Sequence, residues 1–157
     1  MKYTIRPIRS EEYGLLDNFL YEAIYIPEGV QAPPREITKQ PELQVYTQDF
    51  GKYEDDICFV AEADSKAVGA VWVRVMNDYG HVGDGIPSFA VSLYKEYRGN
   101  GMGTALMNQM LVTLREKGYT KASLAVQKAN YAVRMYKKLG FQIIDENEEE
   151  YIMVYEF

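Results

Sequence analysis

A chain of 157 residues, 47% hydrophobic and 25% charged, has the composition of a single soluble domain, spanning residues 1–157, that can bury a core of its own. The formal net charge of −6 disfavours a nucleic-acid partner, which would require a basic face, and is compatible with a cationic small substrate. One histidine and one cysteine provide almost no ligands for zinc, so no metal is expected, and the lone Cys58 reads as a buried thiol in a strand.

The N-terminal stretch from Met1 to Pro7 contains no apolar signal core, and no apolar run approaches 18 residues. We therefore expect a cytoplasmic protein that has no membrane partner.

The first half of the chain predicts two helices and three strands. In order they are a strand at Tyr3–Ile8, a helix capped by Ser10 and running to Ala23, a short helix at Pro41–Phe50, and a hairpin of Ile57–Ala63 with Ala67–Val75. The irregular stretch 21–35 is long, and long loops in compact domains are often functional. It is either a substrate-binding segment or a surface connection whose tyrosines cover the edge of the core.

The second half alternates strands with helices and closes on a hairpin. A loop at 77–87 leads to a strand at Phe89–Leu93, a helix ending at Lys117 before Gly118, a strand at Ala122–Val126, a helix at Asn130–Leu139 ending at Gly140, and strands at Phe141–Ile144 and Tyr151–Tyr155. The order β-α-α-β-β-β-α-β-α-β-β predicts an α/β fold with a mixed sheet, because its early and late strands form hairpins.

The strand at Phe89–Leu93 runs into a turn with alternating glycines, Gly99, Gly101 and Gly103, that opens a helix. Glycine permits positive φ and close approach to the backbone, and a helix N-terminus attracts anions. The turn therefore predicts a cradle for a phosphate, with Arg98 suited to the same charge. The spacing fits neither the Rossmann fingerprint nor the P-loop, and a tight strand-to-helix connection is the alternative.

A second cluster stands about thirty residues later, at Asn130, Tyr136 and the pair Gly140-Phe141. Periodicity places Tyr136 on the apolar face of a helix, so it could serve the core alone, and Asn130 could be an ordinary N-cap.

Taken together, the two clusters resemble the motifs of the GCN5-related N-acetyltransferase (GNAT) superfamily. The run from Arg98 to Gly103 is similar to its R/Q-x-x-G-x-G/A pattern, and Asn130, Tyr136 and Gly140-Phe141 are similar to N-x-x-A/S-x-x-x-Y-x-x-x-G-F, with Ala132 one place early. The resemblance implies a three-layer α-β-α fold with a mixed central sheet. It is weakest over residues 21–56 and 76–86.

The resemblance also implies the ligand and the roles of the residues. Acetyl-CoA would be the co-substrate, with no metal, and its pantetheine arm would follow the strand at Val91 and Leu93 and contact Asn130. The pyrophosphate would lie on the amides of the turn, at Arg98, Gly99, Asn100, Gly101, Met102, Gly103 and Thr104. Tyr136 would be the catalytic acid that protonates the departing sulfur.

No general base stands out. The strand glutamate that some members use corresponds to Gly85 here, which leaves Asp84, His81, Glu22 and Glu28 as candidates. An amine that arrives neutral would need no base.

These features predict an acetyl-CoA-dependent N-acetyltransferase that acts directly on the primary amine of a small molecule, as a monomer or a homodimer. Glu22, Glu28, Asp78 and Asp84 in the variable segments favour a cationic acceptor. The alternative is a non-catalytic acyl-CoA-binding sensor or partner module. The acceptor and the acyl-chain preference cannot be read from the residues.

Overall fold

The structure of this chain is a computed structural model, and it describes residues 2–76 and 81–157. Within them the strands are β1 (Thr4–Pro7), β2 (Ile57–Ala63), β3 (Lys66–Arg74), β4 (Ser88–Leu93), β5 (Lys121–Gln127), β6 (Gln142–Glu146) and β7 (Glu150–Glu156). The α-helices are α1 (Leu16–Ala23), α2 (Pro41–Gln44), α3 (Met102–Glu116) and α4 (Ala132–Leu139), and shorter 3₁₀ turns lie at Ser10–Leu15, Arg35–Lys39 and Lys95–Tyr97.

The strands form one sheet in the order β1-β2-β3-β4-β5-β7-β6. All neighbours pair antiparallel except β4 and β5, which are parallel and separated in sequence by α3. The predicted mixed sheet and the predicted order of helices and strands are therefore confirmed.

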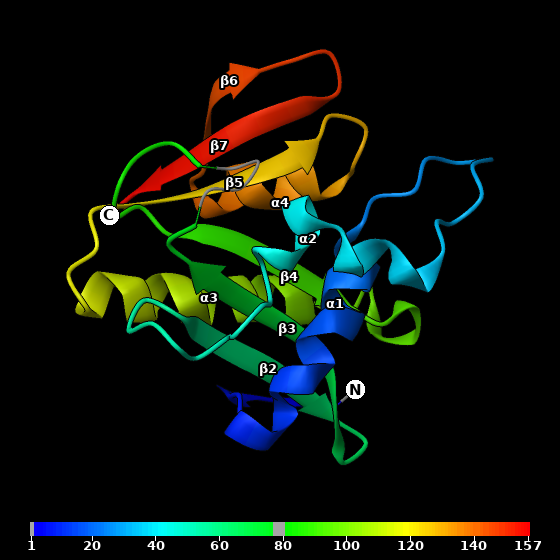
Figure 1. Cartoon of the computed structure of the whole chain (residues 1–157). Coiled ribbons are helices and arrows are strands. Elements are labelled where there is room, and N and C mark those ends of the chain that lie inside the picture. The colour runs from blue at the N-terminus through cyan, green and yellow to red at the C-terminus, as the bar shows by residue number, and fades with distance from the viewer. Residues whose placement is uncertain (1, 77–80) are drawn as a thin grey trace.

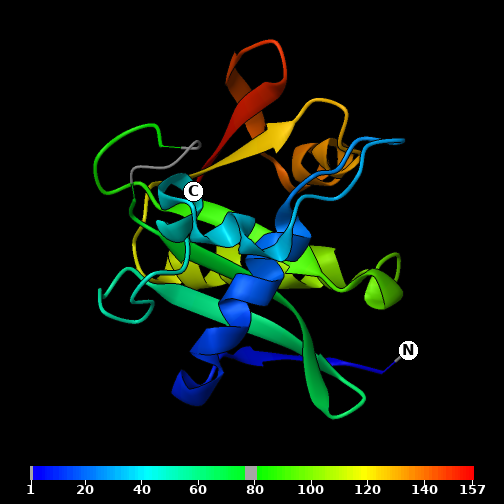
Figure 2. The same cartoon turned by 45° about the vertical axis from the view of Figure 1, so that its right-hand side comes forward.

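Helices cover both faces of the sheet and make three layers (Figures 1 and 2). On one face, α3 and α4 pack on the sheet through side chains such as Leu106, Met110 and Tyr136. On the other, α1 and the segment after α2 enclose Trp72. Burial of these two apolar clusters is the main source of stability, and it fixes α1 and α3 on opposite sides of β4.

Two predicted helices begin or end differently in the structure. Ser10 is not the N-cap of an α-helix: it opens a 3₁₀ turn, because Glu12 accepts both the Arg9 N–H at 2.9 Å and the Arg6 guanidinium at 2.8 Å, which draws the chain toward β1. The helix predicted at Pro41–Phe50 ends at Gln44.

The early end of α2 has a long-range cause. The carbonyl of Tyr46 accepts the indole N–H of Trp72 at 3.0 Å, and those of Val45 and Gln48 accept Arg74 at 3.1 and 2.7 Å. These carbonyls face the sheet and accept hydrogen bonds from side chains of β3, so the chain here does not continue as a helix.

No helix in the described part of the chain is long and apolar enough to cross a membrane.

Candidate functional site

The site is built where β4 and β5 separate. The two strands share a single pair, Ser88 with Ser123, supported by a 2.9 Å hydrogen bond from the Ser123 N–H to the Pro87 carbonyl. Beyond it they spread apart, toward the right in Figure 1. Among the residues that the structure describes, no strand covers this edge of β4 past Ser88, so backbone groups of β4 around Val91 can meet an extended ligand.

The glycine turn lies at the end of this edge and leads into α3. Gly99 and Gly101 both have φ of +81°, and Gly101 is the N-cap of α3 without any side-chain cap. The first helical bond runs from the Ala105 N–H to the Gly101 carbonyl at 3.1 Å, so the amides of the preceding residues, Met102, Gly103 and Thr104, have no acceptor within the helix.

There is room at the turn for an anion. A Cβ built on Gly99 or Gly101 meets no atom within 4 Å, so the backbone is open on the side to which that Cβ would point. Uncapped amides, the positive end of the α3 dipole and an open approach fit a pyrophosphate. The turn thus stays the predicted site for an anion.

Gly103 links the two sequence clusters. A Cβ at this position would lie 3.7 Å from the Met135 Sδ on α4 and 3.8 Å from the Leu93 Cδ1 at the end of β4. The start of α3, the end of β4 and α4 therefore converge here, which brings motifs thirty residues apart in the sequence together in space.

Tyr136 has its ring in the core and its hydroxyl unpaired. Its side chain is 8% exposed and packs on Phe141, with ring centroids 6.0 Å apart, and Phe141 in turn packs on Phe89 of β4 at 5.7 Å. Burial raises the pKa of Tyr136 to about 12, which keeps the phenol protonated at neutral pH. The hydroxyl forms no hydrogen bond with the described residues. Core packing and a donor role for the hydroxyl are thus compatible.

Asn130 and Asn100 are both engaged locally. The Asn130 Oδ1 accepts the N–H of Ala132, the first residue of α4, at 2.9 Å, although the N-cap of this helix is Tyr131 and not Asn130. This bond leaves the amide nitrogen of Asn130 for another partner. The Asn100 Nδ2 donates to the Tyr97 carbonyl at 3.4 Å and braces the turn.

The Arg98 side chain makes its hydrogen bonds to three groups of the protein. Its Nε donates to the Leu93 carbonyl at 2.9 Å, and an Nη donates to the Glu22 carbonyl at 3.2 Å and to the Glu22 carboxylate at 3.4 Å. In this structure its charge is used by protein groups at the ends of β4 and α1.

The four candidate bases do not assemble. Glu22 lies in α1 and pairs with Arg98, Glu28 and Asp84 are exposed, and the His81 Nδ1 lies 3.0 Å from the Met76 carbonyl. No hydrogen bond or ion pair joins any two of them within residues 2–76 and 81–157, and no group of three potential metal ligands occurs there. Asp78 lies outside the described residues.

Sequence reasoning missed Gly69 and Ser92. A Cβ on Gly69 would lie 2.3 Å from the Leu93 Cδ2 and 2.8 Å from the Ser92 carbonyl oxygen, so only glycine lets β4 end where it does. A glycine inside a strand pattern is a signal of such close approach. The Ser92 Oγ donates to the Phe19 carbonyl at 2.5 Å and joins β4 to α1, a contact for which the sequence carries no signal.

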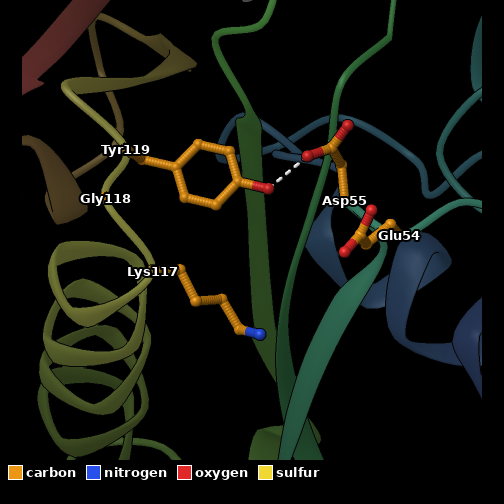
Figure 3. Close-up of a pocket in the computed structure, with 5 residues that line it drawn as sticks. All are labelled: Glu54, Asp55, Lys117, Gly118 and Tyr119. Carbon is orange, nitrogen blue, oxygen red and sulfur yellow. Dashed lines mark hydrogen bonds between the residues drawn. The ribbon is translucent and has the colours of Figure 1, made fainter.

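A separate hollow of about 370 Å³ lies at the far end of α3, lined by Glu54, Asp55, Lys117, Gly118 and Tyr119 (Figure 3). Tyr119 donates a hydrogen bond to Asp55 across it. Because α3 has 15 residues, at about 1.5 Å each, this hollow is roughly 22 Å from the glycine turn and is not part of the site.

Comparison with known proteins gives a consistent result. The family model described as the acetyltransferase (GNAT) family matches residues 22–141. An acetyltransferase of Pectobacterium atrosepticum is 32% identical over 95 residues, which are 59% of this chain and 62% of that protein. N-acetyltransferase family 8 member 2 of Rattus norvegicus is 28% identical over 75% of this chain and 48% of its own length. The chain thus spans less than two thirds of these relatives.

Solved structures agree on the fold. The PaiA N-acetyltransferase of Thermoplasma acidophilum, in complex with coenzyme A, superposes with a TM-score of 0.73 at 20% identity and 100% coverage of both chains. A Salmonella typhimurium protein solved with acetyl-CoA gives 0.68 at 14% identity, over 99% of this chain and 94% of that one.

Proposed function

Since this chain belongs to the acetyltransferase (GNAT) family, we propose that it transfers an acetyl group from acetyl-CoA directly to a primary amine. The observation that carries the proposal is the open β4 edge beside the uncapped amides of the glycine turn, with α4, the helix that carries Tyr136, meeting both through Met135 at Gly103.

The residues divide the work by position. Amides of the turn from Arg98 to Thr104 bind the pyrophosphate, and backbone groups of Val91 and Leu93 align the pantetheine arm, with the Asn130 amide on its other side. The Leu93 carbonyl already accepts Arg98, so its N–H and the groups of Val91 carry this contact. Acetyl-CoA supplies a thioester that is activated toward amines.

Two groups of the chain would assist the transfer. A backbone N–H near Val91 or Leu93 donates to the carbonyl oxygen as negative charge develops on it. The Tyr136 hydroxyl donates its proton to the sulfur as the carbon–sulfur bond breaks. The amine loses its proton to solvent or arrives neutral, since no base is assembled among the described residues.

For the acceptor we favour a small cationic amine. Glu22 no longer supports this choice, because it is paired with Arg98, whereas Glu28 and Asp84 are exposed and free to attract a cation. A relative from Haemophilus influenzae is named for acetylating an alanine of ribosomal protein bS18, and others are named mycothiol acetyltransferases. A peptide that starts with alanine therefore belongs in the same screen.

The decisive experiment measures release of free CoA from acetyl-CoA with a panel of polyamines, amino-glycosides, amino acids and an alanine-starting peptide. Calorimetry with CoA on the same protein separates the possible outcomes. Amine-dependent release supports the transferase. Tight CoA binding without release for any amine would favour a binding module, and absence of both would refute the proposal.

A further inference from the structure

The end of α1 is fastened to the end of β4 by side chains. The Ser92 Oγ donates to the Phe19 carbonyl at 2.5 Å, and Arg98 bridges the Leu93 carbonyl at 2.9 Å and the Glu22 carbonyl at 3.2 Å. The Phe19 and Tyr94 rings add a contact, with centroids 5.1 Å apart.

Residues 24–34, which we call the acceptor lip, begin directly after these contacts between α1 and β4. It returns to α1 through the Tyr21 hydroxyl, which donates to the Pro33 carbonyl at 2.5 Å. It also reaches the other side of the opening, where the Tyr25 hydroxyl donates to the Ala129 carbonyl at 3.4 Å. The lip therefore spans from the β4 side to the β5 side, beside α4 in Figure 2.

Arg98 is well suited to hold this arrangement. The last carbonyls of a helix have no acceptor role within it, and a cation there also meets the negative end of the helix dipole. The planar guanidinium can reach two carbonyls at fixed angles, which a lysine ammonium cannot reproduce. In its ion pair with the Glu22 carboxylate, the Arg98 side chain is 36% exposed and the Glu22 side chain is 26% exposed. Because solvent screens such a pair, it adds little stability, and the hydrogen bonds to the carbonyls hold the two elements together.

We propose that Arg98 is a positioning residue for the acceptor: it clamps the last turn of α1 to the end of β4 and so holds the acceptor lip in register with the glycine turn. The role in alignment rests on the proposed function, whereas the clamp itself does not. A direct contact of the Arg98 side chain with a phosphate of the co-substrate is the competing role.

The clamp is tested first on the free protein by hydrogen exchange. Arg98→Ala is expected to speed exchange in peptides covering residues 20–35 by at least about tenfold, with peptides of β2 and β3 unchanged. Glu22→Gln keeps the carbonyl and should stay within about threefold of wild type. Lys95→Ala removes an exposed cation of the same turn that makes no side-chain hydrogen bond among the described residues, and it serves as the matched control.

Kinetics then separate positioning from phosphate binding. With acetyl-CoA and with acetyl-pantetheine, which lacks the phosphates, Arg98→Ala should raise KM for the amine by at least about tenfold, while the Kd of CoA changes less than about threefold. Loss of CoA affinity with unchanged amine KM, or wild-type exchange in 20–35, would overturn the proposal.

Two safeguards keep the outcomes distinct. Arg98→Gln retains one donor for the Leu93 carbonyl and is expected to give intermediate exchange and intermediate KM, and it replaces the alanine variant if that fails to fold. If the wild-type protein neither binds CoA nor releases it, the proposed function and the alignment role both fail. Even then the exchange measurement still decides whether the clamp exists.

Discussion

Gly101→Val tests the anion cradle directly. Gly101 has φ of +81° and ψ of 0°, and the space into which its Cβ would project is empty to 4 Å. A valine there places a branched side chain over the amides at the start of α3, where the pyrophosphate is proposed to bind.

The expected effect has two parts. Left-handed backbone costs an L-residue about 1–2 kcal/mol, so the variant should lose about that much stability. This strain is present with and without ligand and largely cancels from the binding constant. The loss in binding comes instead from crowding at the amides, and we expect the Kd of acetyl-CoA to rise at least about tenfold, or 1.4 kcal/mol.

Gly103→Ala is the matched control. Its Cβ would point at Met135 and Leu93, at ordinary contact distances of 3.7 and 3.8 Å, and not into the open space. Because alanine favours helix over glycine by up to about 1 kcal/mol, this variant should be at least as stable as wild type and should keep its affinity. The bulkier Gly103→Val should bind acetyl-CoA at least about tenfold more weakly, since its branches have no room between these side chains.

The assay is calorimetry with acetyl-CoA at a temperature below the melting point of each variant, after thermal unfolding has shown that each is folded. Wild-type affinity in a folded Gly101→Val protein would refute the assignment of the pyrophosphate to this turn.

Three further outcomes are expected. Tyr136→Phe should keep stability and acetyl-CoA affinity but lower kcat by roughly 10²-fold at saturating acetyl-CoA. A wild-type kcat under conditions where chemistry limits turnover would show that Tyr136 serves only core packing. The hydrogen bonds of Arg6 lower the pKa of Glu12 from 4.5 to about 2, so this stabilisation is present above pH 4.5 and lost as the pH falls toward 2. In Glu12→Gln, the free energy of unfolding should fall between pH 4.5 and 2 by at most about 3 kcal/mol less than it does in the wild type. Denaturant titrations that show the same fall in both proteins would mean that the Arg6–Glu12 pair does not contribute to stability. Finally, KM for a cationic amine should rise with salt between about 0.05 and 0.5 M while kcat changes little, and equal turnover of acidic amines would contradict the charge argument.

Elements whose cause is local could be predicted from the sequence. The Asp64-Ser65 turn lies between two apolar alternations, and both residues adopt positive φ, 52° and 62°, as a tight hairpin requires. Gly118 and Gly140 end α3 and α4 with φ of 90° and 114°, as expected of glycine beyond a helix. The glycine turn falls in the same class, since three glycines before an apolar helical stripe are visible in the residues alone.

Features that depend on residues far away in the sequence could not be predicted. The carbonyls that stop α2 are taken by Trp72 and Arg74, and no local pattern near Gln44 announces them. The direction of Arg98 depends on Glu22, which is 76 residues away in the sequence. A motif locates a residue in the chain, but the direction of a long, charged side chain is set by which unpaired carbonyls the fold brings within reach.

The protonation of Tyr136 decides how it could act. An unperturbed thiol has a pKa of about 8.5, so a phenol with a pKa of about 12 would give its proton to a thiolate in water only at a cost of roughly 5 kcal/mol. Apolar surroundings act on sulfur in the same sense, however, and burial raises the pKa of Cys58 in β2 above its ordinary value. A leaving sulfur beside Tyr136 would experience the same desolvation. Its pKa would rise as water is excluded, which narrows the difference between the pKa values of the phenol and the thiol. The hydroxyl would therefore act first as a hydrogen-bond donor to the developing charge, with full transfer completed only when the carbon–sulfur bond is largely broken.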